Sequence, residues 1–243
     1  MAADEGLLLY VYRGLLFKVA RGVQAPKAGS LLFARHLEFL PGERVLELGT
    51  GVGLGAVLAA KAGCQVVATD VVPEAAACAR ENAFLNGVGD RVEVRVGDCY
   101  EPVRGLSFDL ICTNPPQMPT PPARERDDSM AAADNGGLDG WEILDKVIRQ
   151  APAHLAPGGR LVFTIFAFLG RKTAFAKLDA AGLKPQVLGS EVQAFPRIGY
   201  ERLDHIRSLD KERVLPASGL PGSIERFVIQ GSLPREIPHR QRR

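Results

Sequence analysis

The sequence predicts an open α/β domain in which helices cover both faces of a mostly parallel sheet. Between residues 43 and 168, short apolar runs alternate with stretches that have helical spacing. Several of these runs are apolar on both faces, as the strands of a covered parallel sheet are. A glycine-rich loop also follows the first run directly. In folds of this class, ligands bind at the carboxyl ends of the strands, so this loop is the first candidate site.

The first half of the pattern contains four expected strands and two expected helices. The strands cover residues 44–48, 64–70, 91–96 and 108–113. An alanine-rich helix is expected to run from the glycine loop to Ala62, and a second helix from Pro73 to about Asn86. Proline suits the first turn of a helix because the N–H that it lacks would have no partner there.

The second half has one strong helical pattern and one long apolar run. Apolar residues recur at helical spacing over residues 141–155, although Pro152 weakens the last turn. Pro157 to Gly159 are expected to break the chain before a strand over 161–169. Beyond it, we expect a helix over 172–181 and strands over 185–194 and 226–231.

Other segments fall outside this regular pattern. Residues 1–40 form an expected N-terminal extension and lead-in, with an apolar stretch at 7–19 and a helix at 31–40. The main domain is expected to span residues 41–235. Within it, residues 196–225 lack periodicity, which indicates an insertion over the sheet end, where substrate lids often lie. Residues 236–243 form an expected basic tail.

Composition is that of an ordinary globular protein. The length of 243 residues is enough for one well-buried domain, and a formal net charge of +2 gives no field that would favour nucleic acid. The four cysteines are too widely spaced for a disulfide framework or a zinc site, so no metal is expected. No apolar run is long enough to span a membrane, and the N-terminal run follows acidic residues, unlike a secretory signal. We therefore expect a cytoplasmic protein.

The loop after the first strand predicts a site for an adenosine-containing cofactor. Glu47 is followed by Gly49, Thr50, Gly51 and Gly53, after which a helix begins. Glycines allow a sharp turn and a close approach of ligand to main chain, and the helix N-terminus offers free N–H groups. The loop alone does not separate a methyl donor from NAD, because its spacing also satisfies a loose dinucleotide pattern.

Two acidic residues follow later strand ends and complete the predicted cofactor site. Asp70, with its neighbour Val71, lies at the distance expected for a carboxylate that accepts hydrogen bonds from both ribose hydroxyls. Asp98, with its neighbour Cys99, is suited to accept from an adenine amino group. The alternatives are an N-cap of the following helix for Asp70 and a turn residue for Asp98.

The tetrapeptide Asn114-Pro115-Pro116-Gln117 ends the fourth strand and predicts methyl transfer to nitrogen. Two prolines fix the backbone and remove two donors, so that its carbonyl groups are free to point outwards. With the side-chain oxygen of Asn114, they can accept both hydrogens of a planar nitrogen and turn its lone pair toward a methyl donor. The remaining contribution of the protein is to align the nitrogen, the methyl group and the sulfur, and the reaction needs neither a metal nor a strong base. On its own, Asn-Pro-Pro is usually a turn.

Together these segments resemble the N-methyltransferases that carry an N-P-P-[YF] motif, and among them the release factor glutamine N5-methyltransferases. The agreement covers about residues 20–170, including the proline-containing lead-in at 23–32 and the segment Gly136–Gly140. It implies a Rossmann-like doubly wound sheet of seven strands and S-adenosylmethionine as cofactor. It also implies a catalytic group and a cofactor-binding group. The catalytic group is Asn114, Pro115 and Gln117; the cofactor-binding group is Glu47, Gly49, Thr50, Gly51, Gly53, Asp70, Val71, Asp98, Cys99 and Asn114.

This sequence departs from the family pattern in three places. Gln117 replaces the aromatic residue that packs on the acceptor, and an amide offers no stacking platform for a nucleobase. Gly29 stands where an acidic residue is common. The sequence has no counterpart of the N-terminal helical domain of bacterial members. Shorter members rely on a partner subunit, and a partner subunit or a homodimer is left open here.

Several functions are compatible with these residues. The leading hypothesis is methyl transfer to a planar nitrogen of a protein glutamine or of a small molecule, with Tyr200 and His205 in the insertion that would shape a pocket. An RNA or DNA adenine N6-methyltransferase should carry a basic, aromatic surface, but acidic neighbours cancel Arg124 and Arg126. An NAD-dependent oxidoreductase leaves the tetrapeptide without a role. A non-catalytic cofactor-binding module is the last alternative.

Overall fold

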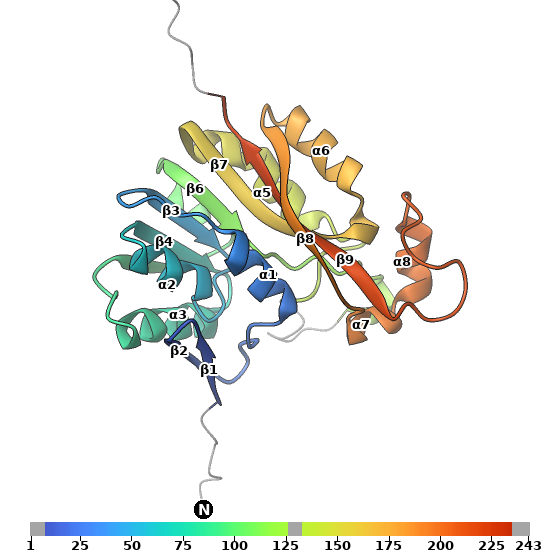
Figure 1. The fold of residues 1–243 in the computed structure, drawn as a ribbon, viewed down its shortest axis with the longest axis horizontal. Helices are drawn as coiled ribbons and strands as arrows, with labels where there is room; N and C mark the ends of the chain where they lie inside the picture. Colours follow the sequence, from blue (N-terminus) through green and yellow to red (C-terminus); the bar gives the residue numbers. More distant parts are fainter. Residues whose placement is uncertain (1–7, 126–132, 235–243) are drawn as a thin grey trace, which may run out of the picture.

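The computed structural model describes residues 8–125 and 133–234, and its centre is a seven-stranded sheet (Figure 1). The strand order is β5-β4-β3-β6-β7-β9-β8. All neighbouring strands are parallel except at β9, which is antiparallel to both β7 and β8. The strand bounds are β3 Arg44–Leu48, β4 Gln65–Asp70, β5 Val92–Val96, β6 Phe108–Thr113, β7 Leu155–Phe166, β8 Lys184–Ala194 and β9 Ser223–Ser232. The predicted mostly parallel, seven-stranded α/β sheet is confirmed.

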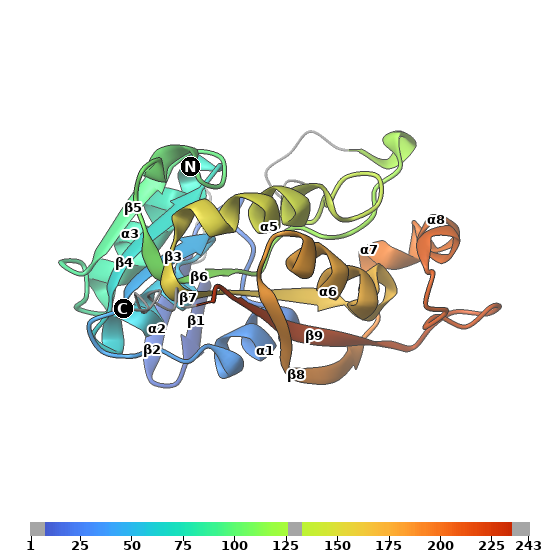
Figure 2. The same cartoon turned by 90° about the horizontal axis from the view of Figure 1, so that it is seen from above.

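Helices cover both faces of the sheet, as Figure 2 shows from above. One hydrophobic cluster packs α1, α2 and α3 on the sheet, and a second packs α5 and α6 on the opposite face. Along β7, Leu161 and Phe163 belong to the second cluster and Val162 to the first, because successive side chains of a strand point to opposite faces. The helix bounds are α1 Ala28–His36, α2 Leu54–Lys61, α3 Pro73–Leu85, α5 Glu142–His154 and α6 Arg171–Ala180.

Two sequence predictions about these elements were wrong. Pro157 to Gly159 do not break the chain; they lie inside β7, whose pairing with β6 shifts register between Phe108 and Leu110. From Phe108 to Leu110 β6 advances two residues while β7 advances five, so the Pro157 to Gly159 stretch is accommodated as a bulge within a strand that continues beyond it. The lead-in helix covers 28–36 instead of 31–40. Its C-cap Leu37 is already extended, and the chain then runs toward Pro41, whose ring disfavours helix in the preceding residue.

The apolar N-terminal stretch forms a hairpin of β1 (Leu8–Tyr12) and β2 (Leu15–Val19), which the sequence did not reveal. Two asparagines one turn apart on α3 bind the backbone of β2 as a neighbouring strand would. The Asn82 amide accepts from the N–H of Lys18 at 2.8 Å and donates to its carbonyl at 2.9 Å. Asn86 makes the same pair of bonds with Leu16, at 3.0 and 2.7 Å. The hairpin is thereby fixed to the domain.

The segment between β8 and β9 contains two short helices where the sequence showed no periodicity. They are α7 (Arg197–Tyr200) and α8 (Leu203–Leu209). Helix α8 packs against the 3₁₀ turn η3 (Ala167–Leu169), which follows the carboxyl end of β7. The segment therefore lies at the ligand-binding end of the sheet. The predicted basic tail and Arg126 lie outside the described residues.

Candidate active site

Two adjoining cavities open at the carboxyl ends of the central strands. The smaller, of about 190 Å³, lies over the ends of β4 and β5, and the larger, of about 570 Å³, lies between the lead-in, α1 and the tetrapeptide. Gly49, Gly51, Asn114 and Pro115 line both cavities. The predicted cofactor loop and the predicted reactive tetrapeptide therefore form the boundary between two halves of one site.

The glycine loop forms a cradle at this boundary. Gly49 and Gly51 have φ values of +66° and +55°, in the left-handed region that favours glycine, and a Cβ on either would meet no atom within 4 Å. A side chain on either would project into open space. Gly53 differs, because its Cβ would lie 3.1 Å from the Cα of Ala79 on α3, and it lines neither cavity. Gly53 thus permits close helix packing, whereas the other two leave room for a ligand.

Glu47 is buried at the end of β3 and organises the loop. Its carboxylate accepts from the Thr50 hydroxyl at 2.5 Å and from the N–H groups of Gly55 and Ala56 at 3.1 and 2.9 Å. Burial raises the pKa of Glu47 to about 7, against the lowering effect of these donors. A Cβ on Gly55 would lie 2.2 Å from the carboxylate, so glycine is required there. Glu47 and Thr50 both line the larger cavity.

Asp70 connects the end of β4 to the glycine loop. Its two oxygens accept from the N–H groups of Gly51 at 2.9 Å and Val72 at 3.0 Å. The N-cap of α3 is Val72, so the alternative of an N-capping Asp70 was wrong. Burial raises the pKa of Asp70 above its ordinary value. Asp70 and its exposed neighbour Val71 line the smaller cavity, as the sequence led us to expect of a ribose-binding pair.

Asp98 and Cys99 line the same cavity from the end of β5. Burial is the largest single effect on Asp98 and by itself would raise its pKa, but the hydrogen bonds from Lys146 and Cys99 and the Lys146 charge together hold the pKa below its ordinary value. Burial beside Asp98 raises the pKa of the Cys99 thiol to about 12, so the thiol is uncharged. Cys99 has a φ of +48°, which is unusual for a residue with a side chain.

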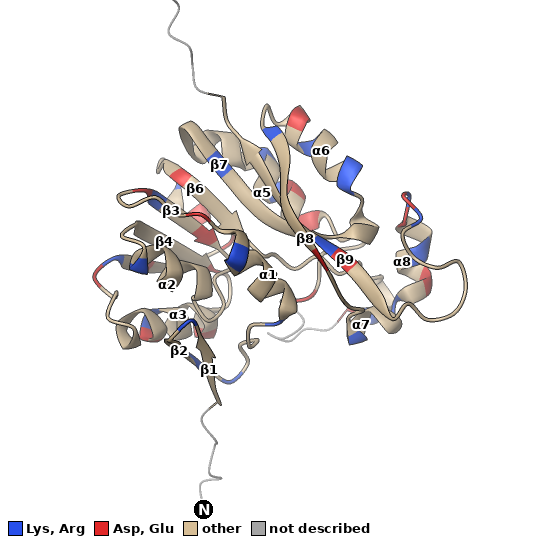
Figure 3. Ribbon diagram, viewed as in Figure 1, with Lys and Arg blue, Asp and Glu red and all other residues tan. Residues whose placement is uncertain are grey.

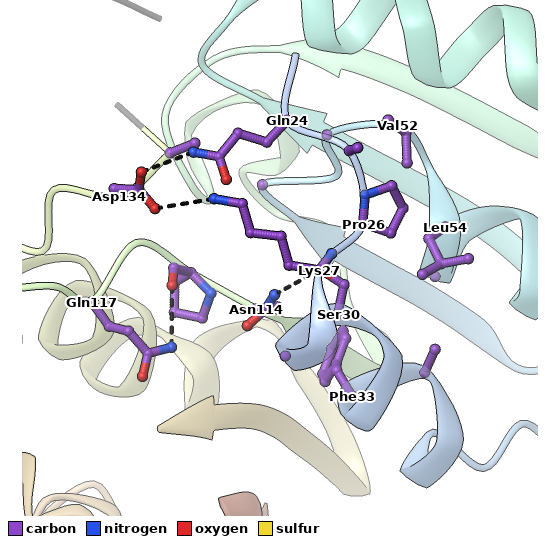
Figure 4. A pocket seen from close by; sticks show the side chains of 18 of the residues that line it. Gln24, Pro26, Lys27, Ser30, Phe33, Val52, Leu54, Asn114, Gln117 and Asp134 are labelled. Atoms are coloured by element: carbon purple, nitrogen blue, oxygen red, sulfur yellow. Dashed lines mark hydrogen bonds and ion pairs between the residues drawn. The ribbon is translucent and has the colours of Figure 1, made fainter. Parts of the chain in front are cut away.

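Asn114 lies between the two cavities, and three side chains hold its amide (Figure 4 shows the Ser30 contact). Its Oδ1 accepts from the Thr164 hydroxyl at 2.6 Å and from Nη1 of Arg226 at 3.3 Å. Its Nδ2 donates to the Ser30 hydroxyl at 3.4 Å. Thr164 and Arg226 come from β7 and β9, and no sequence motif marked either of them. Because the Thr164 hydroxyl and the Arg226 guanidinium both donate to the same end of the Asn114 amide, that end is its oxygen.

Gln117 is buried, with 3% of its surface exposed, and its amide is bonded within the protein. Its Nε2 donates to the carbonyl of Pro115 at 3.3 Å and to the carbonyl of Thr164 at 3.2 Å. Its Oε1 accepts from the N–H of Phe166 at 2.8 Å. Gln117 therefore ties the tetrapeptide to β7. That it takes part in catalysis stays a prediction, and these contacts support a positioning role.

The lead-in and the loop after the tetrapeptide meet across the larger cavity (Figure 4). Gln24 donates to Asp134 at 3.1 Å, and the Lys27 ammonium lies 3.8 Å from the same carboxylate. Gly136 and Gly140 pack on Gln117, because a Cβ on either would lie within 2.7 Å of its backbone. These glycines in the family-like segment are therefore needed for the close return of the chain.

The insertion contributes only its start to the cavity. Pro196, Arg197 and Ile198 line it, whereas Tyr200 donates to the carbonyl of Pro221 at 2.8 Å and His205 contacts the carbonyl of Leu138 at 2.7 Å. Neither Tyr200 nor His205 lines the two cavities. No cluster of three potential metal ligands occurs in the parts of the chain that the structure covers, and none of their helices combines the length and apolar character needed to cross a bilayer.

Comparison with known proteins identifies the class. Residues 22–125 match the family model of the methyltransferase small domain. Among solved structures, the Mtq2–Trm112 complex of E. cuniculi is 18% identical, with a TM-score of 0.55 over 87% of this chain and 99% of that one. The tRNA m1G37 methyltransferase of M. jannaschii is 14% identical, with a TM-score of 0.63 over 96% of this chain and 59% of that one. The chain is an S-adenosylmethionine-dependent methyltransferase.

Sequence relatives narrow the family. A chain of Methanocaldococcus jannaschii named as a protein N5-glutamine methyltransferase is 35% identical over 72% of this chain and 87% of its own length. The release factor glutamine methyltransferase of Aquifex aeolicus is 34% identical over 63% of this chain and 58% of its own length. The ribosomal protein uL3 glutamine methyltransferase of Bradyrhizobium diazoefficiens is 38% identical over 51% and 40% respectively. The chain belongs to the protein N5-glutamine methyltransferase family.

Proposed function

We propose that this chain methylates the side-chain amide nitrogen of a glutamine in a protein substrate. The observation that carries the proposal is the position of Asn114 and Pro115, which border both cavities. A primary amide has two N–H groups, and the Asn114 side chain and the Pro115 carbonyl are two acceptors at one place. The smaller cavity, where the methyl donor would bind, lies on one side of them and is called the cofactor half of the site. The larger cavity, which has room for the methyl acceptor, lies on the other side and is called the acceptor half.

The smaller cavity and the glycine cradle fit S-adenosylmethionine. Asp70 and Asp98 would hold the ribose and the adenine, and Gly49 and Gly51 leave space where a Cβ would intrude. Glu47 faces the larger cavity, where its carboxylate would balance a cationic ligand. When bound, the cofactor supplies an electrophilic methyl group attached to sulfur.

The contribution of the protein's own residues is orientation. An amide nitrogen is a poor nucleophile because its lone pair is delocalised into the carbonyl group. Hydrogen bonds from both amide N–H groups to Asn114 and Pro115 would hold the nitrogen so that its lone pair faces the cofactor half. Thr164 keeps Oδ1 of Asn114 directed at the acceptor, and Gln117 fixes the Pro115 carbonyl. In this position the nitrogen would form a bond to the methyl carbon as the methyl–sulfur bond breaks, with the bonding pair left on sulfur, and it would release one N–H proton to water.

A glutamine is favoured over a nucleobase for three reasons. The names of the relatives refer to glutamine in release factors and in a ribosomal protein. In addition, the Arg226 guanidinium lies 3.7 Å from the centre of the Phe166 ring and covers the face on which a base would stack. Basic and acidic residues are also interspersed on the elements visible in Figure 3, without the one-sided charge that nucleic acid binding uses.

The setting of the enzyme is part of the same proposal. Its substrates would be translation proteins, since the relatives are named for a release factor and for ribosomal protein uL3. That would place its activity in the cytoplasm. A partner subunit also stays a prediction, supported by one structural neighbour that is a complex with Trm112.

The test is methylation of cell-extract proteins with labelled S-adenosylmethionine, followed by detection of N5-methylglutamine in the hydrolysed product. We expect Asn114→Ala to lower the rate by about 100-fold or more, since it removes an acceptor at the reacting nitrogen. Gln230→Ala, an amide on β9 that bonds to Ser232, is the control and should keep the rate. Label in nucleic acid, or undiminished transfer by Asn114→Ala, would refute the proposal.

A further inference from the structure

A half-buried guanidinium lies in the acceptor half of the site. Arg226 on β9 lines the larger cavity, and its Nη1 donates to Asn114 at 3.3 Å. Its Nε is buried without a hydrogen-bond partner. Burial lowers the pKa of Arg226 to about 10, so the group remains charged at neutral pH. The charge thus directly contacts the residue that is proposed to hold the reacting nitrogen.

No carboxylate within the described ranges forms an ion pair with Arg226. Glu191 is its directly paired neighbour on β8, so both side chains lie on one face of the sheet. Glu191 is instead paired with Arg35 of α1. Asp134, at the far side of the cavity, affects Arg226 only through its charge. The guanidinium also lies over the Phe166 ring, an attraction that uses none of its N–H groups. A charge in a cavity wall without an ion-pair partner is available to a bound anion.

The fold makes room for this guanidinium. A Cβ on Gly29 of α1 would lie 1.9 Å from Nη1 of Arg226 and 2.6 Å from its Cζ. Gly29 is also the position at which the family resemblance leads us to expect an acidic residue. Glycine at this position therefore leaves the space that the guanidinium occupies beside Asn114.

We propose that Arg226 binds a carboxylate of the methyl acceptor, so that the methylated amide lies next to a carboxylate. This inference rests on the proposed function. The contact of Nη1 with Asn114 is long for a hydrogen bond and readily exchanged. An incoming amide N–H would replace Nη1 at Oδ1 of Asn114, and the freed guanidinium donors would meet the carboxylate. A carboxylate that neutralises the guanidinium would also favour the reaction, because the nitrogen becomes positively charged as it takes the methyl group.

The carboxylate could also belong to the cofactor, which carries one on its methionine portion. The strand order favours the acceptor. Arg226 lies on β9, beyond β6 and β7 as counted from the glycine loop at the end of β3. Asn114, at the end of β6, lies between the loop and the guanidinium. The two sources are separable, because S-adenosylhomocysteine has this carboxylate and 5′-methylthioadenosine lacks it.

The experiment compares Nα-acetylglutamine, which has a free carboxylate, with its neutral methylamide. Binding of each to the complex with S-adenosylhomocysteine is measured by calorimetry or ligand-observed NMR, and N5-methylglutamine formation is measured in parallel. We expect the carboxylate form to bind at least tenfold tighter to the wild type, and the preference to disappear in Arg226→Gln. Arg226→Lys should keep part of it. Arg149→Gln removes an exposed charge of α5 that lines neither cavity and should keep the preference.

The outcomes separate this inference from the proposed function. Equal binding of the two compounds to the wild type, including no binding of either, overturns the inference. A Kd for S-adenosylhomocysteine that rises at least tenfold in Arg226→Gln, with 5′-methylthioadenosine unaffected, assigns the carboxylate to the cofactor and also overturns it. If both compounds are methylated equally, the proposed function stands without the inference. If no N5-methylglutamine forms on any acceptor while the binding preference is present, only the proposed function fails.

Discussion

The two halves of the site differ in how their charged groups are satisfied. In the cofactor half, Asp70 accepts from two backbone N–H groups and Asp98 is paired with Lys146. In the acceptor half, the half-buried Arg226 makes a long contact with Asn114 and has a buried, unpartnered Nε. The first half is complete before a ligand arrives, whereas the second contains a charge that a ligand would complete. Affinity for the cofactor and choice of acceptor should therefore respond to different residues.

The largest expected effect is a loss of cofactor affinity caused by a substitution in the cofactor half. Asp70→Ala removes the proposed ribose contacts and the bonds from the N–H groups of Gly51 in the glycine loop and of Val72 before α3. We expect the Kd for S-adenosylhomocysteine to rise by about 100-fold, as measured by calorimetry. Asp98→Asn is the matched comparison, and its effect should be smaller because Asp98 is more exposed. An unchanged Kd in Asp70→Ala would remove Asp70 from the site.

The next effect probes the acceptor half. Gly29→Ala places a methyl group in the volume of the Arg226 guanidinium and must displace it. We expect the preference for the carboxylate acceptor to fall by about tenfold, with cofactor affinity kept. The double variant Gly29→Ala, Arg226→Gln should show no further loss. Additive losses in this cycle would mean that the two residues act independently.

A smaller, pH-dependent effect is expected at Glu47. Its pKa in the ligand-free protein is raised to about 7, so a cationic cofactor that favours the ionised form should bind more tightly as pH rises. We expect the affinity for S-adenosylmethionine to rise between about pH 6 and pH 8 and then to level off. Glu47→Gln should flatten this dependence. An affinity that falls with pH over this range contradicts the assignment.

The smallest effect concerns stability. Arg226→Met replaces a half-buried charge that has no ion-pair partner in the described ranges with an apolar side chain of similar length that can still pack on Phe166. We expect the free energy of unfolding of the ligand-free protein to increase by about 1 kcal/mol, seen as a rise in Tm of about 2–4 °C. Arg160→Met breaks a part-buried ion pair with Glu43 and should lower the Tm instead. A fall in Tm for Arg226→Met would mean that its charge is already compensated.

The cofactor half was largely predictable, and the acceptor half was not. Gly49, Gly51, Asp70 and Asp98 follow strand ends, so local pattern and spacing place them together. Arg226 is joined to Asn114 by the pairing of β9 with β7, a contact across 112 residues that no local pattern marks. The sequence singled out Gly29 by its departure from the family. Its physical reason is the guanidinium that occupies the space.

Gln117 shows a second limit of the sequence. An exposed Gln117 would be free to contact the methyl acceptor. The side chain is instead buried, and both ends of its amide form hydrogen bonds with the backbone of β7 and of the tetrapeptide. Residue type alone does not distinguish these situations. The same holds for Tyr200 and His205, which bond to carbonyl groups away from both cavities.

The asparagine contacts of α3 connect the cofactor loop to a distant element. The Nδ2 group of Asn82 donates to Lys18 in the hairpin and also to the carbonyl of Val52 in the glycine loop, each at 2.9 Å. The hairpin strands line neither cavity. Opening of the hairpin would nevertheless release a partner of the loop, and a ligand that holds the loop would slow that opening. Amide exchange in β2 should therefore report cofactor occupancy from outside the site.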